Sequence, residues 1–280
     1  MVKPVPQPVA GQYAIESGLA ELEPEPGNSL GWLLKINGMQ SSHVDLGDPF
    51  RLDFEYMRWI MALVEDRWPL AGSQNAGSPN ASERLRVLHL GGAACSMARY
   101  LVARYPQSRN TVVEIDGRLA TLVREWFALP QAPLLKIRVG EARQVTESLN
   151  AGSRDVVIRD VFSGRFTPVP LTTVEFVQQV KRVLSPDGIY LLNCGDSPAL
   201  GTARREAATL LDAFAHTAIV ADPPMLKGRR YGNIVMAGSD VPLAQSPQLA
   251  RALLGGGLPA TLWTDAQVRD FARKEPVLKD

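Results

Sequence analysis

From Leu85 to Ala237, short apolar runs alternate with segments whose apolar residues recur at helical spacing. This pattern is typical of parallel strands that are covered by helices on both faces of a sheet. It predicts seven strands, at residues 85–90, 111–115, 136–139, 156–160, 189–194, 218–221 and 233–237. The last two are joined by residues 222–232, which are rich in Pro and Gly and too few for a helical crossover, so we expect them to pair antiparallel. The sequence thus predicts an α/β protein with a seven-stranded, mostly parallel sheet.

The segment before this alternation has strand-like runs of its own. Residues 13–22 and 32–36 are such runs, and the turn-forming residues 24–28 separate them. Residues 50–68 place apolar side chains at helical spacing and predict an amphipathic helix. Residues 69–82 are polar and rich in Gly and Pro, which indicates a linker.

One further helix has clear end signals. Thr172 and Glu175 have the spacing of a capping box, and residues 185–188 stop the helix predicted over 172–184. Residues 246–280 are expected to be helical. We therefore divide the chain into an N-terminal β region (1–50), a ligand-binding domain (51–245) and a C-terminal helical extension (246–280).

Composition excludes several classes of protein. The formal net charge of the 280 residues is +1, which gives no electrostatic basis for binding nucleic acid. No run approaches the roughly 18 apolar residues of a membrane span, and the first residues lack the apolar run of a signal peptide. Two cysteines are too few for a disulfide framework, and the three histidines lack metal-ligand spacing. We expect a cytoplasmic protein without a metal.

Polar and small residues gather where the predicted strands end, which is where open α/β sheets bind ligands. Gly91 and Gly92 follow the first strand, and such a turn lets backbone N–H groups approach a ligand closely. Glu114 lies 23 positions after Gly91, close to the roughly 20 expected for an acid that binds ribose hydroxyls. Other such residues are Ile115, Asp116, Gly140, Glu141, Ala142, Asp160 and Asn193. The sequence predicts a nucleoside site, although each acid is equally explained as a helix cap.

Four segments resemble the spermidine synthase (polyamine aminopropyltransferase) family, which has the Rossmann-like fold of class I methyltransferases. They are LKINGMQSS (34–42), VVEID (112–116), VGEA (139–142) and DVVIRDVFSG (155–164). The resemblance implies that Gln40 holds the methionine-derived tail of the ligand, that Glu114 binds ribose and that Glu141 meets adenine. It places Asp160 as the general base and Tyr56 beside the amine.

The same resemblance implies the ligand and the partners. The co-substrate is decarboxylated S-adenosylmethionine or S-adenosylmethionine, with Gly91, Gly92 and Ala93 in its binding turn, and the acceptor is a small-molecule amine. The N-terminal strands imply a homodimer, as in relatives. Three positions depart from the family: Ala94 replaces an acid in the turn, Met57 stands where a histidine or glutamine is common, and Ser163 replaces an aspartate on the substrate side.

Three functions remain open from the sequence. The first is aminopropyl transfer, in which Asp160 removes a proton from the amine. The second is methyl transfer from S-adenosylmethionine, which needs fewer acids around the acceptor and so suits Ala94 and Ser163. The third is a nucleoside-binding protein without turnover.

Two other features have a structural and a functional interpretation each. The basic cluster at 227–230 is either a solvated loop or a clamp for an anionic group. Cys95 is either a small residue of the turn or a redox-sensitive thiol. His89 lies between two leucines and is expected to be a packed strand residue.

Overall fold

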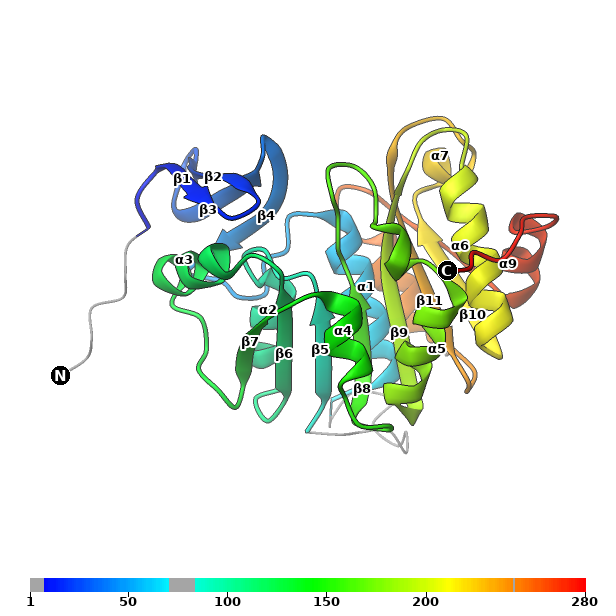
Figure 1. Cartoon of the computed structure of the whole chain (residues 1–280). Helices are drawn as coiled ribbons and strands as arrows, with labels where there is room; N and C mark the ends of the chain where they lie inside the picture. Colours follow the sequence, from blue (N-terminus) through cyan, green and yellow to red (C-terminus); the bar gives the residue numbers. More distant parts are fainter. Residues whose placement is uncertain (1–7, 71–83, 244) are drawn as a thin grey trace.

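A computed structural model describes residues 8–70, 84–243 and 245–280. Its central feature is an eight-stranded sheet with the order β12-β10-β11-β9-β8-β5-β6-β7 (Figure 1). Its strands are β5 (Arg86–Leu90), β6 (Arg109–Glu114), β7 (Leu135–Val139), β8 (Arg154–Arg159), β9 (Leu184–Asp196), β10 (His216–Ala221), β11 (Gly232–Ser239) and β12 (Thr261–Thr264). Strands β5 to β9 pair in parallel, and β10 and β11 form the expected antiparallel pair. The α/β class is confirmed, with eight strands instead of seven.

The eighth strand comes from the segment that was expected to be helical. Residues 246–280 contain α8 (Pro247–Leu254) and α9 (Asp265–Phe271), but β12 lies between them and pairs with β10. This segment therefore belongs to the large sheet and is not a separate helical extension. A four-residue strand is too short for its periodicity to be seen in the sequence.

The N-terminal β region is a separate four-stranded antiparallel sheet. It contains β1 (Gly11–Ile15), β2 (Gly18–Glu25), β3 (Asn28–Ile36) and β4 (Met39–Asp45). The run at 13–22, expected to be one strand, turns back between β1 and β2. Gly18 allows this turn because its φ is +135°, a backbone conformation that residues other than glycine rarely adopt.

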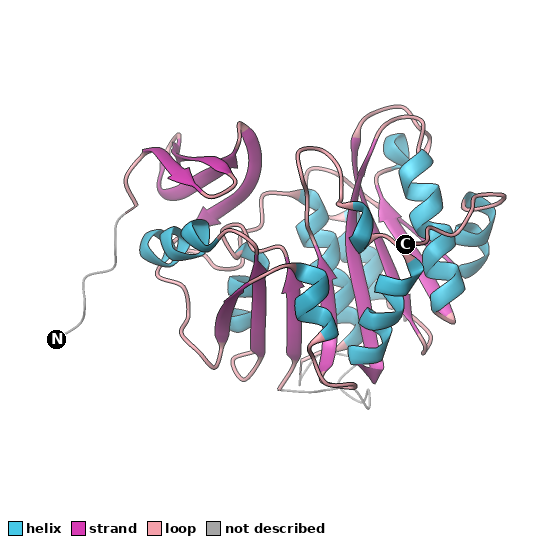
Figure 2. Ribbon diagram, in the orientation of Figure 1, coloured by secondary structure: helices cyan, strands magenta, loops and turns pink. Residues whose placement is uncertain are grey.

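Helices cover both faces of the large sheet (Figure 2). On one face α4, α5, α6 and α9 pack in series, and α1 packs against α8 on the other. The bounds are α1 (Glu55–Arg67), α2 (Ser96–Arg104), α3 (Gly117–Phe127), α4 (Ala142–Glu147), η1 (Val169–Leu171), α5 (Val174–Val183), α6 (Gly201–Ala213) and α7 (Pro223–Leu226). The cap of α5 is Thr173, whose hydroxyl accepts from the Phe176 N–H at 3.4 Å, and not Thr172 as predicted.

The small sheet is fixed against the carboxyl ends of the first strands of the large sheet. Its apolar face shares a core with α3, where Tyr13 and Trp126 have ring centroids 4.8 Å apart. Ser17 also donates to Asp116 through its N–H and its hydroxyl, at 2.7 and 2.8 Å. The small sheet therefore forms one wall of the region where the strands end.

Within the described ranges, no helix has both the length and the apolar character needed to traverse a lipid bilayer. The predicted linker at 69–82 lies mostly outside the described residues.

Candidate active site

The turn after β5 is held in place by Glu114, the last residue of β6. One carboxylate oxygen, Oε2, accepts the N–H groups of Gly92 and Ala93 at 3.2 and 3.1 Å, and Oε1 accepts the Asp116 N–H at 3.1 Å. Burial raises the pKa of Glu114, and the three backbone donors oppose this effect. The structure thus brings together the glycine turn and the acid that the spacing in the sequence connected.

Gly91 brings this turn against the end of β8. Its φ is +87°, and an added Cβ would lie 2.2 Å from the carbonyl oxygen of Asp160. Only glycine combines this backbone conformation with this contact. The nucleoside-type turn and the predicted base are therefore adjacent.

Asp160 follows β8 and accepts hydrogen bonds on both oxygens. The Tyr56 hydroxyl donates to Oδ2 at 2.8 Å, and Asn193 Nδ2 donates to Oδ1 at 3.1 Å. Shielding from water raises the pKa of Asp160, and the two hydrogen bonds oppose this shift. Burial and the adjacent carboxylate raise the pKa of Tyr56, so the phenol stays neutral and remains a donor. This geometry suits a carboxylate that accepts a proton.

Asn193 is the residue of this group to which the sequence assigned no role. It lies on β9, next to β8 in the sheet, and is 1% exposed. Its Oδ1 has no hydrogen-bond partner within the described part of the chain. A buried carbonyl oxygen without a partner is costly, so it is available to a ligand donor. Its place at the end of an apolar strand groups it with the other strand-end residues in the sequence, but gives no role for its side chain.

Two of the predicted acids act as helix caps. Asp116 caps α3 by accepting the Leu119 N–H at 2.8 Å, and with Ser17 as its other donor it is 2% exposed. Glu141 caps α4 by accepting the Arg143 and Gln144 N–H groups at 2.9 and 2.8 Å. The cap explanation therefore describes both carboxylates, and the contact of Glu141 with adenine stays a prediction.

The remaining predicted residues differ in their exposure. Ile115 is 65% exposed, directly beside Glu114, and Gln40 lies exposed in the small sheet. Ser163 is exposed in the loop 161–168, where its backbone bridges to Phe166. Gly140 is half-buried, and Ala142 is buried at the start of α4.

Cys95 and His89 have the structural roles. Cys95 is buried, and burial raises the pKa of its thiol to about 12, so it is not a thiolate at neutral pH. His89 is 3% exposed and contacts Asn110 at 3.0 Å, and burial lowers its pKa to about 4.

Two charged clusters outside the site contain ion pairs. In the basic cluster, Arg230 forms an ion pair with Asp222. Among the described residues, Glu25, His43 and Asp53 lie close enough to be metal ligands, but the Arg51 guanidinium already bonds both carboxylates. A metal would have to displace that cation.

Comparison with known proteins agrees with this geometry. Residues 75–214 match the family model described as the spermine/spermidine synthase domain. The chain belongs to this family. A solved structure of a probable spermidine synthase from Corynebacterium glutamicum ATCC 13032 is 48% identical, with 98% of this chain and 97% of that chain covered and a TM-score of 0.91. The resemblance stated from the sequence is confirmed.

Curated relatives match over shorter stretches. A polyamine aminopropyltransferase of Vibrio vulnificus is 29% identical over 134 residues, 47% of this chain and 44% of that protein. The human eEF1A lysine and N-terminal methyltransferase is 30% identical over 120 residues, 39% of this chain and 17% of that protein. The chain thus spans about half or less of the length of these two relatives.

Proposed function

We propose that this protein transfers the aminopropyl group of decarboxylated S-adenosylmethionine to a small amine, with Asp160 as the base. The observation that carries the proposal is the carboxylate of Asp160, held between Tyr56 and Asn193 and adjoining the turn that Glu114 supports. Membership of the family and the polyamine aminopropyltransferases among the relatives support it.

The reaction forms a C–N bond and breaks a C–S bond. The nitrogen of a neutral amine attacks the methylene carbon beside the sulfonium, and the electron pair of the C–S bond moves to sulfur. The products are methylthioadenosine and a secondary ammonium ion. Because an amine is mostly protonated in water at neutral pH, one proton has to leave before attack, and Asp160 accepts it. A raised pKa makes this carboxylate the stronger proton acceptor.

Tyr56 and Asn193 position the base and the amine. On each carboxylate oxygen of Asp160, one lone pair accepts the hydrogen bond from Tyr56 or Asn193, and the other is left for an N–H of the acceptor. The unpartnered Oδ1 of Asn193 accepts a second N–H of the same nitrogen. Much of the rate then comes from holding nitrogen, carbon and sulfur in line.

The nucleoside half of the site is assigned by family resemblance together with position. Glu114 binds the ribose hydroxyls, Ile115 presents an apolar surface to adenine, and Glu141 approaches its amino group. Gln40, on the wall formed by the small sheet, binds the tail of the co-substrate. The proposed chemistry needs no metal, because the positive charge of the sulfonium already activates the C–S bond and methylthioadenosine leaves as a neutral thioether.

The acceptor is expected to carry few positive charges. A dication loses much solvation on entering the pocket and needs carboxylate partners. Ser163 lacks the carboxylate of the family, so the acceptor side of the site has one carboxylate fewer for a second ammonium group. A monoamine is therefore the better acceptor.

Methyl transfer is the second candidate. The 30% identical methyltransferase and the Ala94 substitution favour it, since an alanine does not repel the carboxylate of S-adenosylmethionine. Calorimetry with both co-substrates tests this point. Comparable affinities support weak discrimination, and a strong preference for the decarboxylated form contradicts it.

Product analysis of the purified chain tests the proposal. Methylthioadenosine indicates aminopropyl transfer, S-adenosylhomocysteine indicates methyl transfer, and binding without either product indicates a protein without turnover. Asp160→Asn should abolish methylthioadenosine formation and keep nucleoside affinity, whereas turnover in that variant would remove Asp160 from the role of base. Tyr56→Phe, which removes the donor to Asp160, should slow methylthioadenosine formation, and Tyr100→Phe is its matched control, because Tyr100 donates to Glu65 instead.

A further inference from the structure

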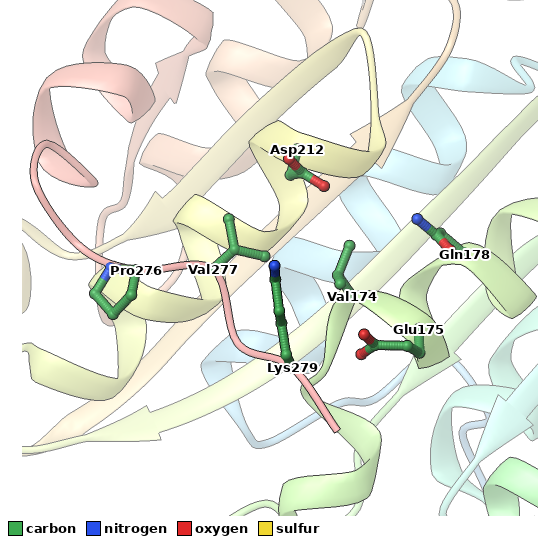
Figure 3. A pocket seen from close by; sticks show the side chains of 7 residues that line it. All are labelled: Val174, Glu175, Gln178, Asp212, Pro276, Val277 and Lys279. Carbon is green, nitrogen blue, oxygen red and sulfur yellow. The ribbon is translucent and has the colours of Figure 1, made fainter.

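Residues 274–280 lie along the helical face of the large sheet, between α5 and α6. The Leu278 carbonyl accepts the Val174 N–H at 2.8 Å, and the Leu278 N–H donates to the Thr209 hydroxyl at 3.0 Å. Figure 3 shows Val277 and Lys279 beside Val174, at a cavity of about 560 Å³ that Asp212 of α6 also lines. Two backbone hydrogen bonds thus fix this segment to two helices.

The segment ends in an acid that connects two further elements. The Asp280 carboxylate accepts from Arg143 Nη1 and Nη2 at 2.7 and 2.5 Å and from the Thr173 hydroxyl at 2.8 Å. Its N–H donates to Glu175 at 3.0 Å. A fork of two parallel bonds fixes direction as well as distance. The Arg143 guanidinium lowers the pKa of Asp280, so the carboxylate is charged at neutral pH.

The two partners of Asp280 belong to opposite sides of the proposed site. Arg143 lies in the first turn of α4, two residues after Glu141 on the nucleoside side. Thr173 caps α5, just after the loop 161–168 that follows Asp160 and carries Ser163. That loop packs close to β9, since a Cβ on Gly195 would lie 3.3 Å from the Phe162 ring.

The backbone between the loop and α5 is held by arginines. Arg143 Nη1 donates to the Pro170 carbonyl at 3.3 Å, and Arg159 Nη1 donates to the Leu171 carbonyl at 2.7 Å. Arg143 therefore holds this stretch directly through Pro170 and indirectly through Asp280 and Thr173. The C-terminal end of loop 161–168 is thus attached to a stretch of chain that α4 holds in place.

We propose that Arg143 and Asp280 are positioning residues. Through the backbone at 169–173, directly after loop 161–168, they set the acceptor side of the site relative to its nucleoside side. The inference rests on the proposed function only for what the two sides bind. Neither residue touches substrate in this scheme. Their pairing determines where Ser163 and Phe162 stand with respect to Asp160.

Steady-state kinetics test the role in turnover. Asp280→Asn keeps a hydrogen-bond acceptor for Thr173 but loses the charge and one arm of the fork. We expect the KM of the acceptor amine to rise about five-fold, equivalent to ~1 kcal/mol, with kcat and the KM of the co-substrate changed less than about two-fold. Asp270→Asn, which removes the exposed ion pair between Asp270 of α9 and Arg273, is the matched control and should change none of the three.

Exchanging the charges of Arg143 and Asp280 distinguishes an effect of their ion pair from a general loss of local structure. Arg143→Asp combined with Asp280→Arg restores an ion pair with opposite polarity, and the acceptor KM should return at least halfway to that of the unmodified chain. Equal defects in the single and double variants would overturn the inference. So would a uniform loss of kcat with an unchanged acceptor KM.

Proteolysis tests the same inference without turnover. Arg165 is the trypsin site of the exposed loop, so the cleavage rate after Arg165 reports how often the loop leaves its position. In Asp280→Asn we expect cleavage there to be about five-fold faster, ~1 kcal/mol by the same conversion, with and without methylthioadenosine as the probe ligand. Faster cleavage in a chain that forms no methylthioadenosine would keep this inference and reject the proposed function. Equal cleavage rates would reject the inference whatever the chain catalyses.

Discussion

The buried ion pair between Arg159 and Glu206 allows a test of how β8, the strand before Asp160, is stabilised against α6. Arg159 is the last residue of β8, directly before Asp160, and is 0% exposed, while Glu206 on α6 is 2% exposed. Arg159 Nη2 donates to Glu206 Oε2 at 2.5 Å, and its Nη1 bonds the Leu171 carbonyl. Two charges are therefore buried, and each is compensated mainly by the other.

Removing one partner should cost far more than removing both. Glu206→Gln leaves the Arg159 charge buried without its counter-charge, which typically costs about 3–5 kcal/mol. Within the described residues, Arg159 Nε and Glu206 Oε1 have no hydrogen-bond partner, so few other contacts can compensate for the loss of the ion pair. Replacing both residues by apolar ones of similar size, Arg159→Met with Glu206→Leu, should change the free energy of unfolding by less than about 2 kcal/mol.

Urea unfolding followed by far-UV circular dichroism measures these differences, provided that the slope of the transition is unchanged. Asp270→Asn, which breaks an exposed pair, should shift the free energy by less than about 0.5 kcal/mol. A loss below about 1 kcal/mol in Glu206→Gln would refute the reasoning, because water would then be reaching Arg159. A double variant less stable than Glu206→Gln would refute it as well.

Three further predictions follow from single positions. Gly91→Ala should weaken nucleoside binding at least about ten-fold in calorimetry, since its Cβ would overlap the Asp160 carbonyl and move the turn; unchanged affinity would contradict the tight approach. His89 has a pKa of about 4 in the folded chain and about 6.5 in the unfolded chain, so on acidification the unfolded state binds the proton first. The free energy of unfolding should therefore decrease as the pH is lowered from about 6.5 to 4, by up to ~3 kcal/mol. His89→Gln should remove that part of the pH dependence in acid titrations of stability. Cys95 and Cys194 are both buried with raised pKa values, so neither should react with a thiol reagent until the chain unfolds, and fast labelling of the folded chain would disprove this.

The part of the site that depends on local sequence could be predicted. From Gly91, just after β5, to Glu114 the chain forms one helix and one strand, and the parallel pairing of β5 with β6 then brings the two residues together. Asp160 and Tyr56 are 104 positions apart, and only the family resemblance connected them. Spacing along the chain alone carries no information about such a pair.

Two kinds of feature could not be predicted, for different reasons. The acids after β6 and β7 have the same sequence pattern whether they bind a ligand or cap the next helix, so Asp116 and Glu141 remained ambiguous until their N–H donors were known. Arg159 directly follows three buried apolar residues of β8, which signals a buried partner. The sequence does not say that this partner is Glu206, because the pairing depends on how α6 packs on the sheet.

The two sides of the proposed site differ in how hydrogen bonds hold their backbone in place, and this difference bears on substrate specificity. On the nucleoside side, Glu114 holds the turn, Asp116 ties α3 to the small sheet, and the Ala94 N–H donates to Ser42 of that sheet at 3.2 Å. On the acceptor side, loop 161–168 exposes Phe166, and the hydrogen bond from Arg143 holds the chain just beyond the loop, at Pro170. We expect an acceptor that binds against this exposed loop to lose more affinity to ordering the loop than a nucleoside loses at the hydrogen-bonded turn. Substitutions in the loop should therefore change which amine is accepted and leave the affinity for the nucleoside unchanged.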